Sequence, residues 1–587
     1  MTSIIETGKL PELELPIPAD QLFYPDRTNN PQLKPIAQFI DYVHYPTLGC
    51  PALLGPENRL QVMLSLPTSV DYASLTFHLV DRHRQQGSTF ELHFDGDPTE
   101  IARSPGGDRR LIHLWFRMDN APFALFDLQV SFDGVKEVQY NAVQRYRDIT
   151  GSEQVLFCGD SQYHVDNRAC LEKFIQRVNS LDVAWIAIIG DICDNGVKGW
   201  RNILKLAASA EPTPVTHYYN REYREAHELL RTLRHPVLLC PGNHDGMSAY
   251  AGYNEGIPSE VYTGPDTLNA VEYDGLHHFR CTFGPLYFSF DWAGTRYLFT
   301  NTFELTRNQR LGYHAIVANW GGWMRPPQVN WIKKKLEEAK GMRKVLLMHH
   351  DPRGGSEGVN LGHYHRMRNY TFDHKWPILK AYLSYAIRHG RTKWQQEWMA
   401  PAHGDVADHP VQHLLRTALE NDLWAVIMGH DNENWVDSYF QGDELFLTEP
   451  SSIRYATRAD IDDEELVDNI IDYLEVANYQ ELSSFLETKD ETAVEAAMSA
   501  ALDEMERAAE PANVMFVANP AESWGLEVKS AIHFVHVDDI GSYKYSEESD
   551  FDDYGYVLAT LDGGAPVRVQ SHRISGRTGI VRNLEVD

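Results

Sequence analysis

The feature that most constrains the fold is a set of short, continuously apolar runs in the middle of the chain. They read VLFC, VAWIAII, VLLC, VLLM and WAVIM, and longer, helix-compatible stretches separate them. Strands that are apolar throughout belong in sheets that helices cover on both faces. We therefore predict an α/β domain that begins near residue 151.

A polar residue of a metal-binding type follows each of these five runs. The motifs are GDSQ at Asp160, GDICDNG at Asp191, PGNHDG at Asn243, MHHDP at His349 and GHDN at His430. A single Asp after a strand is usually a helix N-cap, and a single His is usually a satisfied core or surface residue. Unconnected caps, however, have no reason to supply metal-ligand types at all five strand ends. Because ligands bind at the carboxyl ends of strands in open α/β sheets, we expect one shared site.

This mixture of residue types indicates a particular chemistry. Carboxylates, amide oxygens and imidazoles together suit hard to borderline cations such as Mn²⁺, Fe or Zn²⁺. One Asp can bridge two ions about 3.5–4 Å apart, which clamps the attacking and leaving oxygens of an in-line phosphoryl displacement. The sequence therefore predicts metal-assisted phosphoester hydrolysis.

The five motifs resemble those of the calcineurin-like metallophosphoesterase superfamily. Its pattern is DxH, GDxxD, GNHD or GNHE, a strand-terminal His, and GHxH. The resemblance covers roughly residues 152–455, and GDICDNG and PGNHD are its most specific parts. It implies a four-layer α/β fold, in which two facing β-sheets are flanked by helices and a dinuclear metal site lies at one edge. We assign this catalytic domain to residues 151–457.

The resemblance also implies a ligand set for two divalent metal ions. Asp191 would bridge the two ions, Asn243, His349 and His430 would complete the shell of one ion, and Asp160 would bind the other.

Catalytic roles follow from the same resemblance. His244, supported by Asp245, would contact the phosphate and protonate the leaving oxygen while a metal-bridging hydroxide attacks phosphorus. Asn243 would also contact the substrate, and Arg353 is a candidate for one more phosphate contact.

Two positions depart from the superfamily pattern. Gln162 stands where DxH has its His, and Asn432 stands where GHxH has its second His. Both fall on the same ion, so we predict that Gln162 and Asn432 are amide ligands of that ion. Amide oxygen is a weaker and harder donor than imidazole nitrogen, which favours Mn²⁺, with Fe, Zn²⁺ or Mg²⁺ as other candidates. Alternatively, neither amide coordinates, and the site holds one ion or recruits other residues.

Some further residues could contribute to the site. His164 and the loop sequence GHYH at 362–365 are candidate replacement ligands. Residues 353–420 are rich in His, Arg, Trp and Tyr, which is typical of a cationic, aromatic lid over an anionic substrate, or equally of a helical insertion with an exposed face. The stretch from Trp320 to Trp323 could form a pocket wall or pack in the core.

The segments on either side of the catalytic motifs have a different character. Residues 1–38 are rich in Pro and polar residues, which indicates an extended arm. Residues 39–150 contain alternating runs such as FDLQVSF between Pro, Gly and Asp clusters, which predicts an N-terminal antiparallel β-sandwich. Residues 458–512 form an acidic helical segment, either a solvated excursion or an interaction tail, and residues 513–587 supply strands that complete the catalytic domain.

Composition argues against several other classes. The chain has 53 Lys and Arg against 83 Asp and Glu, a formal net charge of −30, which argues against general nucleic-acid binding and against a nuclease. No secretory signal is recognisable, and no apolar run approaches the ~20 residues of a membrane span, so we expect a cytoplasmic protein. The six Cys have no CxxC spacing and are expected to be reduced core thiols.

The resulting hypothesis is a metal-dependent phosphoesterase that acts on a small phosphorylated substrate, either a phosphomonoester or a phosphodiester. The alternative is a non-catalytic metal-binding scaffold or interaction protein with an eroded second metal site. A β-sandwich before the catalytic domain also resembles purple acid phosphatases, but the tyrosine of their second motif is missing from GDICDNG. The sequence assigns no oligomeric state.

Overall fold

The computed structural model describes the chain in segments. These are residues 42–56, 59–83, 87–103, 107–118, 121–147, 153–163, 167–193, 215–245, 276–303, 324, 326–352, 410–430, 435–441, 443, 445–448, 515–518, 525, 529–541, 554–562, 565–575 and 578–582. The predicted arm, the acidic segment 458–512 and residues 353–409 of the predicted lid lie outside them.

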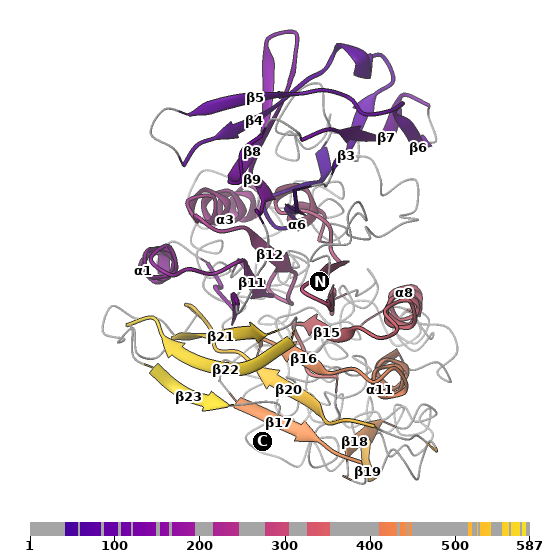
Figure 1. The fold of residues 1–587 in the computed structure, drawn as a ribbon, viewed down its shortest axis with the longest axis vertical. Helices are drawn as coiled ribbons and strands as arrows, with labels where there is room; N and C mark the ends of the chain where they lie inside the picture. Colours follow the sequence, from indigo (N-terminus) through magenta and orange to yellow (C-terminus); the bar gives the residue numbers. More distant parts are fainter. Residues whose placement is uncertain are drawn as a thin grey trace, which may run out of the picture.

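Two sheets at one end of the molecule are built from the N-terminal part of the chain (Figure 1). One contains β1 (Tyr42–Tyr45), β3 (Leu60–Pro67), β7 (Arg109–Phe116) and β6 (Thr99–Arg103), in that order. The other contains β2 (Ala52–Leu54), β9 (Val135–Arg145), β8 (Leu125–Phe132), β4 (Thr76–Asp81) and β5 (Ser88–Leu92). All described pairs are antiparallel except β2 with β9. A short 3-10 helix, η2 (Tyr72–Ser74), precedes β4.

Two six-stranded sheets form the rest of the core. The first has the order β12 (Val237–Cys240), β11 (Ile186–Ile189), β10 (Glu153–Gly159), β21 (Gly555–Asp562), β22 (Ala565–Arg573), β23 (Thr578–Arg582). The second has the order β13 (Phe288–Trp292), β14 (Thr295–Phe299), β15 (Arg343–Met348), β16 (Ala425–Met428), β20 (Ile532–His536), β17 (Trp435–Tyr439). A separate pair joins β18 (Leu445–Thr448) and β19 (Met515–Ala518).

The two six-stranded sheets share one apolar core. Trp185, which is completely buried, contacts Phe290 and Tyr297 of the second sheet, with ring centroids 5.7 and 5.1 Å apart. On the far face of the second sheet, α8 (Pro326–Glu338) and α11 (Pro410–Glu420) contribute to a separate apolar cluster. On the first sheet, Phe174 of α1 (Arg168–Val178) packs on Tyr556. The prediction of a mixed α/β fold with N-terminal antiparallel sheets is confirmed.

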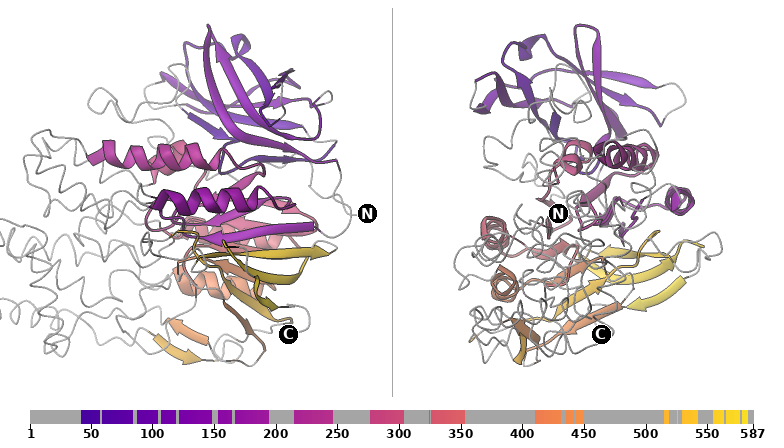
Figure 2. Two further views of the ribbon diagram at one scale, coloured as in Figure 1. Left: turned by 90° about the vertical axis from the view of Figure 1, so that its left-hand side faces the viewer. Right: turned by 180° about the vertical axis from the view of Figure 1, so that it is seen from behind.

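The helices α3 (Val215–Leu230) and α6 (His277–Thr282) lie between the N-terminal sheets and the first six-stranded sheet (Figures 1 and 2). Asn141 of β9 connects these layers, because its side-chain amide donates to the carbonyls of Arg231 and Leu233 just after α3, at 3.0 and 2.8 Å. Among the described helices, none combines the length and the apolar character that crossing a bilayer requires.

The residues after β20 join the two six-stranded sheets. Val537 donates its N–H to Met428 of β16, whereas Asp539 bridges to Gly159 at the end of β10 and Ile540 donates to the Asp160 carbonyl. The carboxyl ends of strands from both sheets are therefore held together at one edge. The last eleven residues of the predicted lid form α11, whose buried Leu414 and Ala418 pack in the second sheet's outer cluster.

Candidate metal centre

Four of the predicted ligands meet at this edge. Asp160 follows β10, Asp191 follows β11, His349 follows β15 and His430 follows β16. Each offers a ligand atom, and these atoms all lie within 4.8 Å of one another in a buried cluster. Residues 160 and 430 are 270 positions apart in the chain and follow strands of different sheets, so the packing of the two sheets brings them together.

His349 lies at the centre of the cluster. Its Nδ1 is 3.0 Å from the Ile189 carbonyl oxygen, which can only accept, so Nδ1–H donates and Nε2 faces the other ligands. That Nε2 lies 2.9 Å from Asn243 Oδ1, 3.1 Å from His430 Nδ1 and 3.3 Å from Asp191 Oδ2. Neighbouring ligand atoms around an ion with bonds of about 2.1 Å are about 3 Å apart, so the spacing fits a shared cation.

The charges of the cluster favour a cation at the same place. Burial lowers the pKa of His349, but the carboxylates of Asp191 and Asp160 outweigh it and raise that pKa to about 9. For Asp191 burial acts in the opposite direction, yet the nearby His349 and His244 hold its pKa below the usual range. The buried groups thus hold a positive charge among them, which is a proton or a metal ion.

Asp160 has the clearest sign of a missing partner. Its Oδ1 accepts a hydrogen bond from the His430 backbone N–H at 3.1 Å. Its Oδ2 is buried and finds no hydrogen-bond partner within the part of the chain that the structure describes. Burial raises the pKa of this carboxyl group to about 7, with His349 opposing and Asp191 adding to the rise. A buried carboxylate oxygen without a donor fits a metal ligand.

Gln162 also reaches the cluster. Its backbone N–H donates to the Asp191 carbonyl at 2.7 Å, and its side-chain Nε2 donates to Asp191 Oδ2 at 3.2 Å. Turning the amide by 180° would present Oε1 to an ion beside that carboxylate. Asn432, Arg353, His164 and the 362–365 loop lie outside the described residues.

Three of the candidate ligands have left-handed backbones. The φ angles are 36° at Gln162, 51° at Asp191 and 71° at His430. Non-glycine residues rarely adopt positive φ, and such strain persists where the surroundings impose it, commonly at functional sites. The strain supports a role for these side chains beyond ordinary capping.

Two motif glycines are required by close packing against the ligands. A Cβ at Gly190 would lie 2.1 Å from His349 Nδ1, and a Cβ at Gly242 would lie 2.2 Å from Asp191 Oδ1. The ligand side chains occupy the space that any other residue would fill.

His244 lies beside Asp191. Its backbone N–H donates to Asp191 Oδ1 at 2.7 Å, and its Nε2 is 3.8 Å from Asp191 Oδ2. His244 and His430 are 7% and 8% exposed, whereas Asp160, Asp191, Asn243 and His349 are at most 1% exposed. The accessible side of the cluster is therefore the side of His244 and His430.

Asp245 accepts hydrogen bonds from the backbone of two loops. Its carboxylate accepts from the N–H groups of Ile192 and Cys193 at 3.0 Å and of Gly242 at 2.9 Å. Burial and the charge of Asp191 raise its pKa to about 7. These contacts brace the loop after β11 against the loop after β12, whereas the predicted support of His244 stays a prediction.

Comparison with known proteins agrees with this geometry. The sequence model of one family, described as calcineurin-like phosphoesterase, matches residues 154–460, which is more than half of the chain and contains every ligand candidate. The chain belongs to the calcineurin-like phosphoesterase family. The predicted resemblance is confirmed. The predicted enzyme class, a hydrolase acting on phosphoric ester bonds, is confirmed with it.

Individual relatives are distant. A glycerophosphodiester phosphodiesterase, GpdQ of Enterobacter lignolyticus (strain SCF1), is 26% identical over 131 residues, which is 22% of this chain and 36% of GpdQ. The match thus spans about a third of that relative's length. A solved structure of PhoD aligns with 92% of this chain and 89% of its own, at 10% identity and a TM-score of 0.39.

Sequence reasoning missed the surroundings of the cluster. Thr302, which follows β14, lies with Oγ1 2.7 Å from Nδ1 of His350, and Asp351 pairs with His536 of β20 at 3.2 Å. The second His of MHHDP was the available signal for His350. Thr302 and His536 stand in no motif, so neither could be predicted from the sequence.

Proposed function

We propose that the protein is a metal-dependent hydrolase of phosphoesters. The observation that carries the proposal is the convergence of buried Asp, Asn and His side chains from both sheets, with Asn243, His430 and Asp191 within 3.3 Å of His349 Nε2. Family membership supports the same reaction class.

We propose that two divalent ions bind at this edge. Asp191 would be shared, Asn243, His349 and His430 would hold one ion, and Asp160 would hold the other together with Gln162 and Asn432. When bound, such ions would activate a water molecule as the nucleophile and neutralise charge on the phosphoryl oxygens. The oxygen-rich half favours Mn²⁺, with Fe, Zn²⁺ or Mg²⁺ as other candidates.

The protein's own groups would then orient the ester and supply the proton. His244 lies on the accessible side, beside Asp191, and is not one of the proposed metal ligands, so it would protonate the leaving oxygen. Asn243 and Arg353 would contact the phosphoryl group. Asp245 would act through the loop that carries His244 and Asn243.

The substrate class is proposed from chemistry and from the relative. The chain carries a formal net charge of −30, which favours a small phosphorylated substrate over nucleic acid, and we expect cytoplasmic action. The relative GpdQ is named for a phosphodiester, so a phosphodiester is the first substrate to test, beside a phosphomonoester.

The alternative is a binding protein with an eroded metal site. The donated hydrogen bond from Gln162 Nε2 to Asp191 Oδ2 favours it, because an N–H group in that place cannot bind a cation. In this case the protein would hold one ion and hydrolyse nothing.

Hydrolysis of aryl phosphate esters distinguishes the two. Chelator-stripped protein is re-supplied with Mn²⁺ and given an aryl phosphodiester and an aryl phosphomonoester. The proposal predicts Mn²⁺-dependent turnover that Asp191→Ala abolishes. No turnover with Mn²⁺, Fe²⁺, Zn²⁺ or Mg²⁺ would favour the binding protein.

A further inference from the structure

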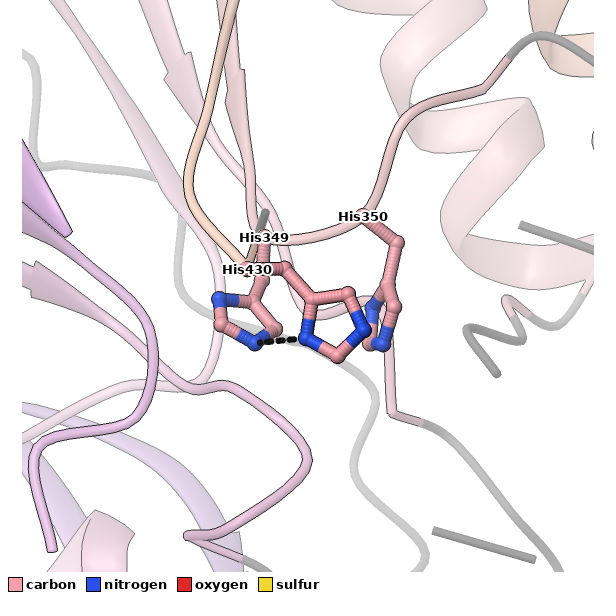
Figure 3. A group of neighbouring side chains, drawn as sticks. All are labelled: His349, His350 and His430. Atoms are coloured by element: carbon pink, nitrogen blue, oxygen red, sulfur yellow. Dashed lines mark hydrogen bonds between the residues drawn. The ribbon is translucent and has the colours of Figure 1, made fainter. Parts of the chain in front are cut away.

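His350 lies beside two of the cluster's ligands, His349 and His430, although the superfamily pattern has a single His at this point. It is fully buried, and its ring centroid is 4.8 Å from that of His349 and 4.4 Å from that of His430. One nitrogen from each of the three rings lies within 4.8 Å of the others. Figure 3 shows the His430 ring between the other two, with its Nδ1 bonded to His349.

Thr302 helps to fix the position of His350. Its Nδ1 is 2.7 Å from the hydroxyl oxygen of Thr302, which is itself buried. The preceding residue, Asn301, is held by Gln328 of α8, whose side-chain amide accepts from the Asn301 N–H and donates to its carbonyl, both at 2.9 Å. Outer contacts of this kind orient metal-binding imidazoles and select the nitrogen that binds. In the tautomer whose Nδ1–H donates to Thr302, Nε2 carries the lone pair.

The composition of the ligand set also favours a third imidazole. It lacks the two imidazoles that the superfamily pattern places at Gln162 and Asn432, so the second half of the site is rich in oxygen. A His beside His349 and His430 would make the first half correspondingly rich in nitrogen.

We propose that His350 is a further metal ligand, and that it makes a three-imidazole half-site with His349 and His430. The two halves would then select different ions. The nitrogen-rich half would take a borderline ion such as Zn²⁺, Fe²⁺ or Co²⁺, and the oxygen-rich half would take Mn²⁺ or Mg²⁺. This inference rests on the ligand set of the proposed function.

Metal titration of the chelator-stripped full chain tests the role of His350. Calorimetry with Co²⁺ and, separately, Mn²⁺ is compared among the wild type, His350→Gln, Thr302→Val and His536→Gln. His536 is the matched control, because it is also a buried His, 1% exposed, on β20 beside β16. It bonds to Asp351 and belongs to neither group of converging potential metal ligands found among the described residues.

The expected result is a loss of metal affinity that is larger for Co²⁺ than for Mn²⁺. His350→Gln weakens Co²⁺ binding about 10- to 100-fold, Thr302→Val weakens it less, and both reduce Mn²⁺ affinity by a smaller factor. His536→Gln leaves both affinities unchanged. Unaltered Co²⁺ affinity in His350→Gln would overturn the proposal, and so would an equal loss for both ions, which indicates a structural effect.

X-ray absorption of the wild type covers the case in which His350→Gln does not fold. With one equivalent of Co²⁺, the imidazole scattering should correspond to three rings, and two rings would refute the assignment. Both readouts are metal binding, so failure of ester hydrolysis would count against the proposed function alone.

Discussion

Gly190→Ala should disable the metal centre while leaving the fold in place. The new Cβ would lie 2.1 Å from His349 Nδ1. Ordinary van der Waals contact begins at 3.4 Å, so the imidazole would have to move by the difference, about 1.3 Å. Metal–ligand distances tolerate only about 0.2 Å, and a misplacement of about 1 Å can reduce a rate about 100-fold. We expect lost metal at His349 and at least that decrease in Mn²⁺-dependent turnover.

Gly341→Ala is the matched control for this effect. Gly341 has a φ of 78°, against 84° at Gly190, so an Ala at either position costs about 1–2 kcal/mol for its left-handed backbone. A Cβ at Gly341 meets nothing within 4 Å. The assay is metal content by mass spectrometry together with ester hydrolysis for both variants. Equal metal content and equal rates would refute the reasoning from close packing.

Three further predictions concern single side chains. Burial raises the pKa of Glu137 to about 7, so the free energy of unfolding falls as pH rises from about 4.5 through 7. Glu137→Gln should therefore raise the free energy of unfolding by up to about 3 kcal/mol at pH 8 and leave it unchanged near pH 4. Equal increases at both pH values, measured by urea unfolding, would contradict this. Gln162→His should restore an imidazole and raise Zn²⁺ affinity relative to Mn²⁺ affinity in competitive titration, whereas an unchanged ratio would remove Gln162 from the ligand set. Asp245→Asn should cost about 2 kcal/mol of stability, because one amide oxygen cannot accept all three backbone N–H groups, and an unaltered urea midpoint would argue against the brace.

The sequence predicted the centre of the site because the local rule and the global fold agree there. Apolar strands specify a covered sheet, and the residues after parallel strands must lie at one edge. The sequence therefore predicts that four ligands lie together, whatever the strand order. They are Asp160, Asp191, His349 and His430.

The surroundings could not be predicted in the same way. His536 ends β20 and Asp539 follows it, and only the register of β20 against β16 and the bridge from Asp539 to Gly159 fix where they lie. Thr302 follows β14, whose sequence TRYLF is not continuously apolar, so that strand was not recognised. The parallel pairing of β2 with β9 likewise depends on long-range contacts that alternation of residues does not encode.

Anomalous diffraction from crystals soaked with Mn²⁺ tests the central claim most directly. The account predicts two Mn²⁺ peaks about 3.5–4 Å apart, with Asp191 between them, one beside His349 and His430 and the other beside Asp160. The absence of a peak among these residues, or a single peak that leaves Asp160 without an ion, would contradict it.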